Sequence, residues 1–124
     1  MMAVMRTLLA AAALIAVSMP ACSPPPTREE RAQAAELARL APLKQRYSGV
    51  IVGFDFAGPA TLIVSLDIQA YIGTDDDTIL AMKRDVLTRW RDAWTAGHPH
   101  RHATLHARWI DFVGKTILTQ TVKV

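Results

Sequence analysis

The sequence predicts an α+β domain with a ββαββ core, in which a four-stranded, mostly antiparallel sheet is packed by one amphipathic helix. Apolar and polar residues alternate with period two over residues 48–73 and again over 102–124, as they do in strands. Between these regions, residues 74–97 repeat their apolar side chains with the period of a helix. A further helix-forming segment before the first strand region is expected to be an N-terminal stalk helix.

The composition indicates one domain with a hydrophobic core, because the chain has 124 residues and 51% of them are apolar. The formal charge is only +3, and basic residues are interleaved with acidic ones along the chain. Such a pattern is typical of a solvated surface, so no nucleic-acid partner is expected. We expect a leader at 1–21, a spacer with the stalk helix at 22–47, and a small α+β domain at 48–124.

The first 21 residues have the features of an export signal. A cation, Arg6, is followed by an apolar run from Leu8 to Val17 and then by small and turn-forming residues. A helix needs about 20 apolar residues to cross a bilayer, and this run has only half that length. A permanent transmembrane anchor is therefore not expected.

The stretch Met19–Cys22, with the sequence MPAC, resembles the lipobox of bacterial lipoproteins, in which a cysteine follows a small residue directly after the apolar run. The resemblance implies a diacylglyceryl thioether on the Cys22 sulfur, cleavage just before Cys22 and acylation of the new amino group. It implies a domain that faces the periplasm from a lipid anchor, and Ser23 favours the outer membrane. The alternative is an ordinary cleavage after Ser18, which leaves Cys22 as a free thiol.

A stiff spacer and a helix are expected to follow the cysteine. Residues 23–26 contain three prolines in a row and predict an extended, polyproline-like segment. Thr27 stands three residues before Glu30, which is the spacing of a capping box, and the helix is expected to end at Pro42. Its apolar stripe is thin, so we expect it to pack weakly or to act as a stalk. The stripe consists of Ala34, Leu37, Ala38, Leu40 and Ala41.

The first strand pair is expected to be a hairpin around a turn at Gly58 and Pro59, with the second strand continuing to Gly73. A second hairpin is expected around Gly114 and Lys115. In the first pair, the side chains expected to face the helix are Val52, Phe54, Val64 and Leu66. Those expected on the opposite face are Ile51, Asp55, Ile63, Ser65, Asp67, Gln69 and Tyr71.

That opposite face is expected to be partly covered, because it mixes apolar with charged residues. The third strand is apolar on both sides at Trp109, Ile110, Phe112 and Val113. The cover is expected to come from the N-terminal helix, from a second copy of the chain or from a partner protein. This face is the strongest functional indication in the domain, and it favours binding over catalysis.

The helix at 74–97 is expected to begin at Thr74 as N-cap and to end at Gly97 and Pro99. The carboxylates of residues 75–77 are expected to stabilise the positive end of the helix dipole. A calcium loop is not expected, because the ligand spacing of an EF-hand is absent. Trp90 and Trp94 lie in the apolar arc, which favours core packing over a ligand-stacking platform. Lys83 lies in the same arc, so its ammonium group either reaches solvent at the sheet edge or pairs with a strand aspartate. The strand aspartates are Asp55, Asp67 and Asp111.

Four histidines are crowded between the second helix and the third strand. They are His98, His100, His102 and His106. Imidazoles bind zinc, copper and nickel, and residues two apart in an extended chain project to the same side. Carboxylate or thiolate ligands at a matching spacing are absent, so the histidines are weak metal candidates and we assign no metal, no cofactor and no catalytic residue.

The sequence thus predicts a small, non-enzymatic envelope lipoprotein whose lipidated residue is Cys22. We expect it to bind an unidentified envelope protein as an accessory subunit of an envelope complex, or to associate with itself through the sheet face. One alternative is a periplasmic metal-binding module that uses the histidines. Another is a small hydrolase whose site is assembled from residues distant in the sequence.

Overall fold

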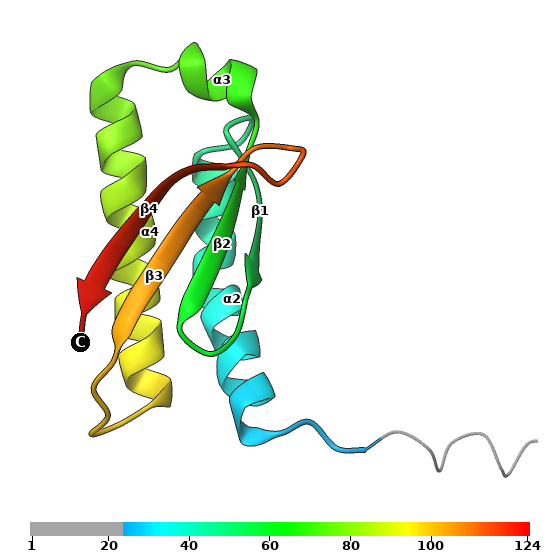
Figure 1. The fold of residues 1–124 in the computed structure, drawn as a ribbon, viewed down its shortest axis with the longest axis vertical. Coiled ribbons are helices and arrows are strands. Elements are labelled where there is room, and N and C mark those ends of the chain that lie inside the picture. Colours follow the sequence, from blue (N-terminus) through cyan, green and yellow to red (C-terminus); the bar gives the residue numbers. More distant parts are fainter. Residues whose placement is uncertain (1–23) are drawn as a thin grey trace, which may run out of the picture.

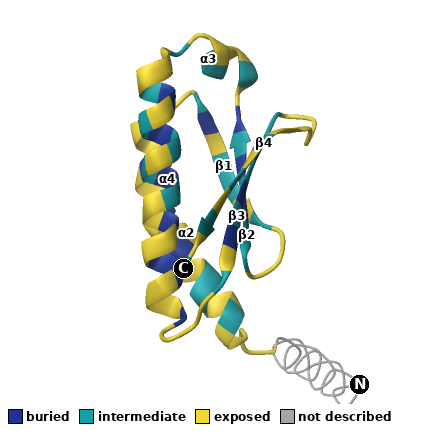
Figure 2. Ribbon diagram, turned by 60° about the vertical axis from the view of Figure 1, so that its left-hand side comes forward, coloured by how far each residue is buried: buried dark blue, intermediate teal, exposed yellow. Residues whose placement is uncertain are grey.

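The computed structural model describes residues 24–124, which form two layers, with both long helices on one face of a sheet (Figures 1 and 2). The leader, the lipobox-like stretch and Cys22 lie outside the described residues. The elements in chain order are α2 (Arg28–Arg46), β1 (Ile51–Phe56), β2 (Thr61–Leu66), α3 (Ile68–Ile72), α4 (Asp76–Gly97), β3 (Thr104–Ile110) and β4 (Thr116–Lys123).

The four strands lie in the order β1-β2-β3-β4 and form a mixed sheet. The pairs β1–β2 and β3–β4 are antiparallel hairpins, whereas β2 and β3 are parallel. The parallel pair arises because α4 carries the chain back along the sheet, so β3 starts at the end where β2 started (Figure 1). The α+β class and the four-stranded sheet are confirmed. The ββαββ order is not confirmed, because α3 is inserted before α4 and because α2 lies beside α4 in the helical layer.

The second strand is shorter than the sequence predicted, because a helix begins directly after it. β2 ends at Leu66, and Asp67 is the N-cap of α3. Its Oδ1 accepts hydrogen bonds from the backbone N–H groups of Gln69 at 3.0 Å and Ala70 at 3.2 Å. The short polar side chain thus offers the backbone a helical turn in place of a strand ladder. The assignment of Asp67, Gln69 and Tyr71 to the sheet face was therefore wrong.

A bulge in β1 changes which side chains face the helices. The pairing with β2 shifts between Ile51 and Gly53, which places one extra residue in β1. Ile51 is buried, whereas Val52 is 55% exposed. The prediction for these two residues was therefore wrong, because a shift of one residue exchanges the two faces of a strand. The inward-facing predictions are confirmed for Phe54, Val64 and Leu66.

Helix α2 begins as the sequence predicts and then packs more closely than predicted. Thr27 is its N-cap and accepts a hydrogen bond from the Glu30 N–H at 3.1 Å. The predicted end at Pro42 was wrong, because the helix continues through Pro42 to Arg46, with Leu40 and Leu43 buried in the core. Burial of two leucines contributes about 3–6 kcal/mol, against a cost of about 3 kcal/mol for a proline inside a helix. The stalk helix is not confirmed, because α2 forms part of the core beside α4.

The core contains three tryptophans, and each indole N–H has an acceptor. The Trp90 N–H donates to Glu36 at 2.8 Å, the Trp94 N–H to the Pro59 carbonyl at 3.3 Å and the Trp109 N–H to the Gln120 amide oxygen at 3.0 Å. Buried indoles are usually satisfied in this way. Trp90 and Trp94 are almost fully buried, which confirms their packing role.

Helix α4 begins one residue later than predicted, with Asp75 rather than Thr74 as its N-cap. The Asp75 carboxylate accepts hydrogen bonds from the Thr78 hydroxyl at 2.8 Å and from the Thr78 N–H at 3.0 Å. These two bonds lower the pKa of Asp75. The Thr74 hydroxyl instead donates to the Ala70 carbonyl in α3 at 2.6 Å. As predicted, α4 ends at Gly97.

Candidate interaction site

Exposed large apolar side chains gather at one end of the domain, which we call the apolar end. The start of β1, α3, the first turns of α4 and the β3–β4 turn all lie there, away from the start of α2 (Figures 1 and 2). Large apolar side chains that are exposed at one end of a soluble domain are candidates for contact with another molecule. The side chains of the apolar end are Val52, Ile72, Leu80, Phe112, Val113 and Ile117.

The β3–β4 turn contributes the two most prominent of these side chains. β3 ends at Ile110, so Phe112 and Val113 belong to the turn and not to the third strand as predicted. Their exposed fractions are 88% and 70%. The signal that identifies this turn is Asp111 followed three residues later by Gly114, a common pairing of turn residues.

Hydrogen bonds hold this turn in one conformation. The Asp111 Oδ1 accepts bonds from the Val113 N–H at 3.1 Å and from the Lys115 N–H at 2.8 Å, and the Gly114 N–H donates to the Asp111 carbonyl at 3.1 Å. Gly114 has φ 84°, a conformation that glycine adopts without steric cost. The exposure of Phe112 is therefore a property of a well-bonded turn.

Helix α3, which carries Ile72, makes one contact with α4 between an aromatic ring and a cation. The Lys83 ammonium lies 5.4 Å from the centre of the Tyr71 ring. Among the described residues Lys83 forms no ion pair. The strand aspartates considered as its partners bond to backbone N–H groups instead, as Asp67 and Asp111 do above and as Asp55 does with Phe56. The apolar position of Lys83 is thus explained by its contact with α3.

The outer face of the sheet is more polar than the sequence suggested. Arg108 pairs with Thr119 and His106 with Thr121 across β3 and β4, so these four residues share the outer face. The expectation that the N-terminal helix covers this face was wrong, because α2 packs beside α4 on the other one (Figure 2). The exposed apolar groups are concentrated at the end of the sheet.

The four histidines do not converge. Both ring nitrogens of His98 have protein partners: Nδ1 lies 2.8 Å from the Trp94 carbonyl and Nε2 lies 3.1 Å from the Glu29 carboxylate. The His102 Nδ1 lies 3.2 Å from the Val124 carbonyl. His100 lies in the turn after α4 and has φ 64°, and His106 lies on the outer face of the sheet. Within residues 24–124, no group of three or more histidine, cysteine, aspartate or glutamate side chains is placed to hold a metal ion.

One buried carboxylate was not anticipated from the sequence. Glu36 is 1% exposed, and its Oε1 accepts the Trp90 hydrogen bond. Its Oε2 has no hydrogen-bond partner. Burial raises the pKa of Glu36, and the Trp90 bond offsets this only in part. The sequence signal for its burial is the spacing of Glu36 to Leu40 and Leu43, which places all three residues on one helix face.

Comparison with protein-family models, curated proteins and solved structures identifies no match to this chain. In the described part of the chain, no helix combines the length and the apolar character that crossing a bilayer requires.

Proposed function

We propose that this protein is a small, non-enzymatic lipoprotein of the bacterial cell envelope that binds a partner protein through its apolar end. The observation that carries the proposal is the gathering of exposed apolar side chains from β1, α3, α4, the β3–β4 turn and β4 at one end of the domain. Covering a Phe or Val side chain contributes about 1.5–3 kcal/mol. A handful of such side chains at the centre of an interface is enough for specific binding.

The position of the proposed anchor favours a protein partner over the anchoring membrane. Five residues separate Cys22 from the first residue of α2. Helix α2 has 19 residues, which corresponds to about 28 Å. It leads from the tethered end of the domain toward the apolar end (Figure 1). A lipid on Cys22 would therefore hold the apolar end away from the bilayer, on the periplasmic side and, by the identity of Ser23, at the outer membrane.

The acidic residues near the apolar end indicate the chemistry of the partner. Asp75, Asp76 and Asp77 stand at the start of α4, close to Leu80 in the sequence. An apolar centre with carboxylates beside it suits a partner with an apolar patch and nearby basic residues. We propose an envelope protein of this kind, with the present chain as its accessory subunit.

Partner binding is tested by crosslinking in intact cells followed by mass spectrometry. We expect the Phe112→Ser/Val113→Ser variant to lose the specific crosslinked neighbour by at least tenfold, because both side chains are exposed and the substitutions remove apolar surface that a partner would cover. Leu37→Ser is the matched control, because Leu37 is an exposed apolar residue of α2. Equal capture by both variants would place the interface elsewhere, and recovery of a homodimer alone would favour self-association.

The anchor is tested by measuring the mass of the mature protein extracted from membranes. We expect the chain to start at Cys22 and to carry two or three acyl chains, which together anchor it stably. Cys22→Ser is expected to abolish both the added mass and the membrane association. A mature chain that starts at Met19 without added lipid would contradict the lipoprotein assignment.

A further inference from the structure

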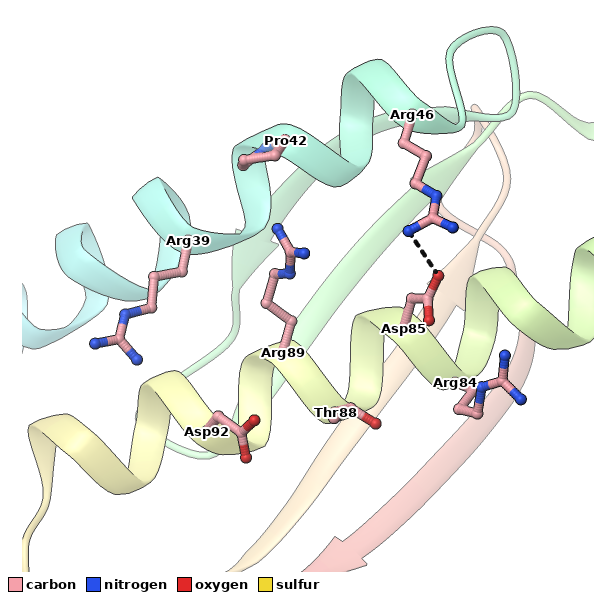
Figure 3. A pocket seen from close by; sticks show the side chains of 8 residues that line it. All are labelled: Arg39, Pro42, Arg46, Arg84, Asp85, Thr88, Arg89 and Asp92. Carbon is pink, nitrogen blue, oxygen red and sulfur yellow. Dashed lines mark ion pairs between the residues drawn. The ribbon is translucent and has the colours of Figure 1, made fainter.

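A groove of about 750 Å³ lies between α2 and α4 and is lined only by residues of these two helices (Figure 3). Its volume is within the range of about 300–1,000 Å³ that is usual for ligand sites. The groove is open, and most of its lining side chains are charged. They are Arg39, Pro42 and Arg46 of α2, and Arg84, Asp85, Thr88, Arg89 and Asp92 of α4.

Both carboxylates of the groove already have partners. Asp85 accepts a hydrogen bond from the Tyr47 hydroxyl, and its Oδ2 lies 3.6 Å from the Arg46 Nη1. Asp92 lies 3.7 Å from the Nε of Arg91, which is outside the groove lining. The groove lining contains four guanidinium groups and two carboxylates, so its net formal charge is positive.

Three guanidinium groups of the groove form no ion pair among residues 24–124. They belong to Arg39, Arg84 and Arg89. Arg39 extends from α2 and Arg89 from the facing side of α4, so both project into the space between the helices (Figure 3). This excess of positive charge in one groove attracts anions.

The groove is compact rather than elongated. Its lining covers two turns of each helix, or about 11–12 Å along either axis. Guanidinium groups form paired hydrogen bonds with phosphoryl oxygens, and several of them can share one phosphorylated ligand. The Thr88 hydroxyl adds a neutral donor to the same wall. A short cluster of this kind suits a compact anion better than an extended acidic peptide.

We propose that this groove binds phosphoryl groups, supplied either by a free polyphosphate or by the headgroups of anionic phospholipids. Arg39 and Arg89 are the principal ligands, and Arg84 and Thr88 contribute at the edge. The site is lined by different residues from the apolar end, so it goes beyond the proposed partner binding and can succeed or fail independently of it.

The first test is calorimetric titration of the full protein with sodium tripolyphosphate at constant ionic strength. We expect the Arg39→Gln/Arg89→Gln variant to bind at least tenfold more weakly than the wild type. The matched control is Arg31→Gln/Arg101→Gln, which removes the same charge outside the groove and is expected to bind as the wild type does. Equal weakening in both variants, or equally tight binding of polyglutamate, would show attraction by charge alone and overturn the proposal.

The second test separates the two sources of phosphoryl groups by the melting temperature of the protein. Vesicles of phosphatidylcholine are compared with vesicles that also contain phosphatidylglycerol. A ligand at ten times its dissociation constant is expected to raise the melting temperature by about 5 °C or more. A rise that requires phosphatidylglycerol and the two arginines assigns the groove to lipid headgroups. A response to tripolyphosphate alone assigns it to a free polyphosphate, and a response to neither overturns the proposal.

Discussion

Replacing Trp90 with alanine is expected to lower the free energy of unfolding by about 3–5 kcal/mol. Trp90 is fully buried between the helices and the sheet, so the substitution leaves a large cavity. It also removes the indole N–H that donates a hydrogen bond to the buried Glu36 carboxyl group. Domains of this size are stable by only about 5–15 kcal/mol, so the variant is expected to be close to unfolding under ordinary conditions.

The cavity and hydrogen-bond contributions can be separated by urea denaturation followed by circular dichroism. Trp90→Phe keeps much of the apolar volume but removes the N–H, and is expected to lose less stability than Trp90→Ala. Leu80→Ala changes an exposed residue and is expected to stay within about 0.5 kcal/mol of the wild type. A loss below about 1 kcal/mol for Trp90→Ala would contradict the described core.

Replacing Glu36 with glutamine is expected to change the pH dependence of stability. Burial raises the pKa of Glu36 in the folded chain above its value in the unfolded chain. Below the unfolded pKa, about 4.3, the carboxyl group is neutral in both states and carries no linkage penalty. As the pH rises from the unfolded toward the folded pKa, the unfolded chain ionises while the folded chain keeps its proton, so the wild type loses stability that the glutamine variant keeps. The loss is complete above the folded pKa. The variant should therefore gain on the wild type with rising pH.

The measurement is urea denaturation of both proteins at about pH 4, 6 and 8. The difference between the two free energies of unfolding isolates Glu36, because the other titrating groups are common to both. Glutamine retains an oxygen that can accept the Trp90 hydrogen bond. A difference that stays constant over this pH range would show that Glu36 is not desolvated as described.

The two proposed surfaces are expected to respond to separate substitutions. Phe112 and Val113 belong to the β3–β4 turn, whereas Arg39 and Arg89 belong to the helix layer. The six exposed side chains of the apolar end are too far apart in the sequence to form a recognisable motif. The arginines of the groove are also ordinary in the sequence, since they lie on the polar sides of two separate helices. Only the packing of α2 against α4 brings them together.

Local signals in the sequence predicted much of the secondary structure. Thr27 and Glu30 have the spacing of a helix start, and the apolar stripe with Trp90 and Trp94 has the period of a helix. Such signals are readable because they depend on residues only a few positions apart. The signal at Asp67 was equally local, but the alternating pattern around it concealed the helix start that it marks.

By itself, the sequence determined the α+β class, the two hairpins, the starting region of each long helix and the apolar side of α4. The tertiary structure alone decided the parallel pairing of β2 with β3, the bulge at Ile51 and the docking of α2 with Glu36 inside the core. It also decided which apolar residues remain exposed and which arginines line one groove. The physical reason is that periodicity and capping are short-range properties, whereas burial and charge pairing depend on contacts between distant segments.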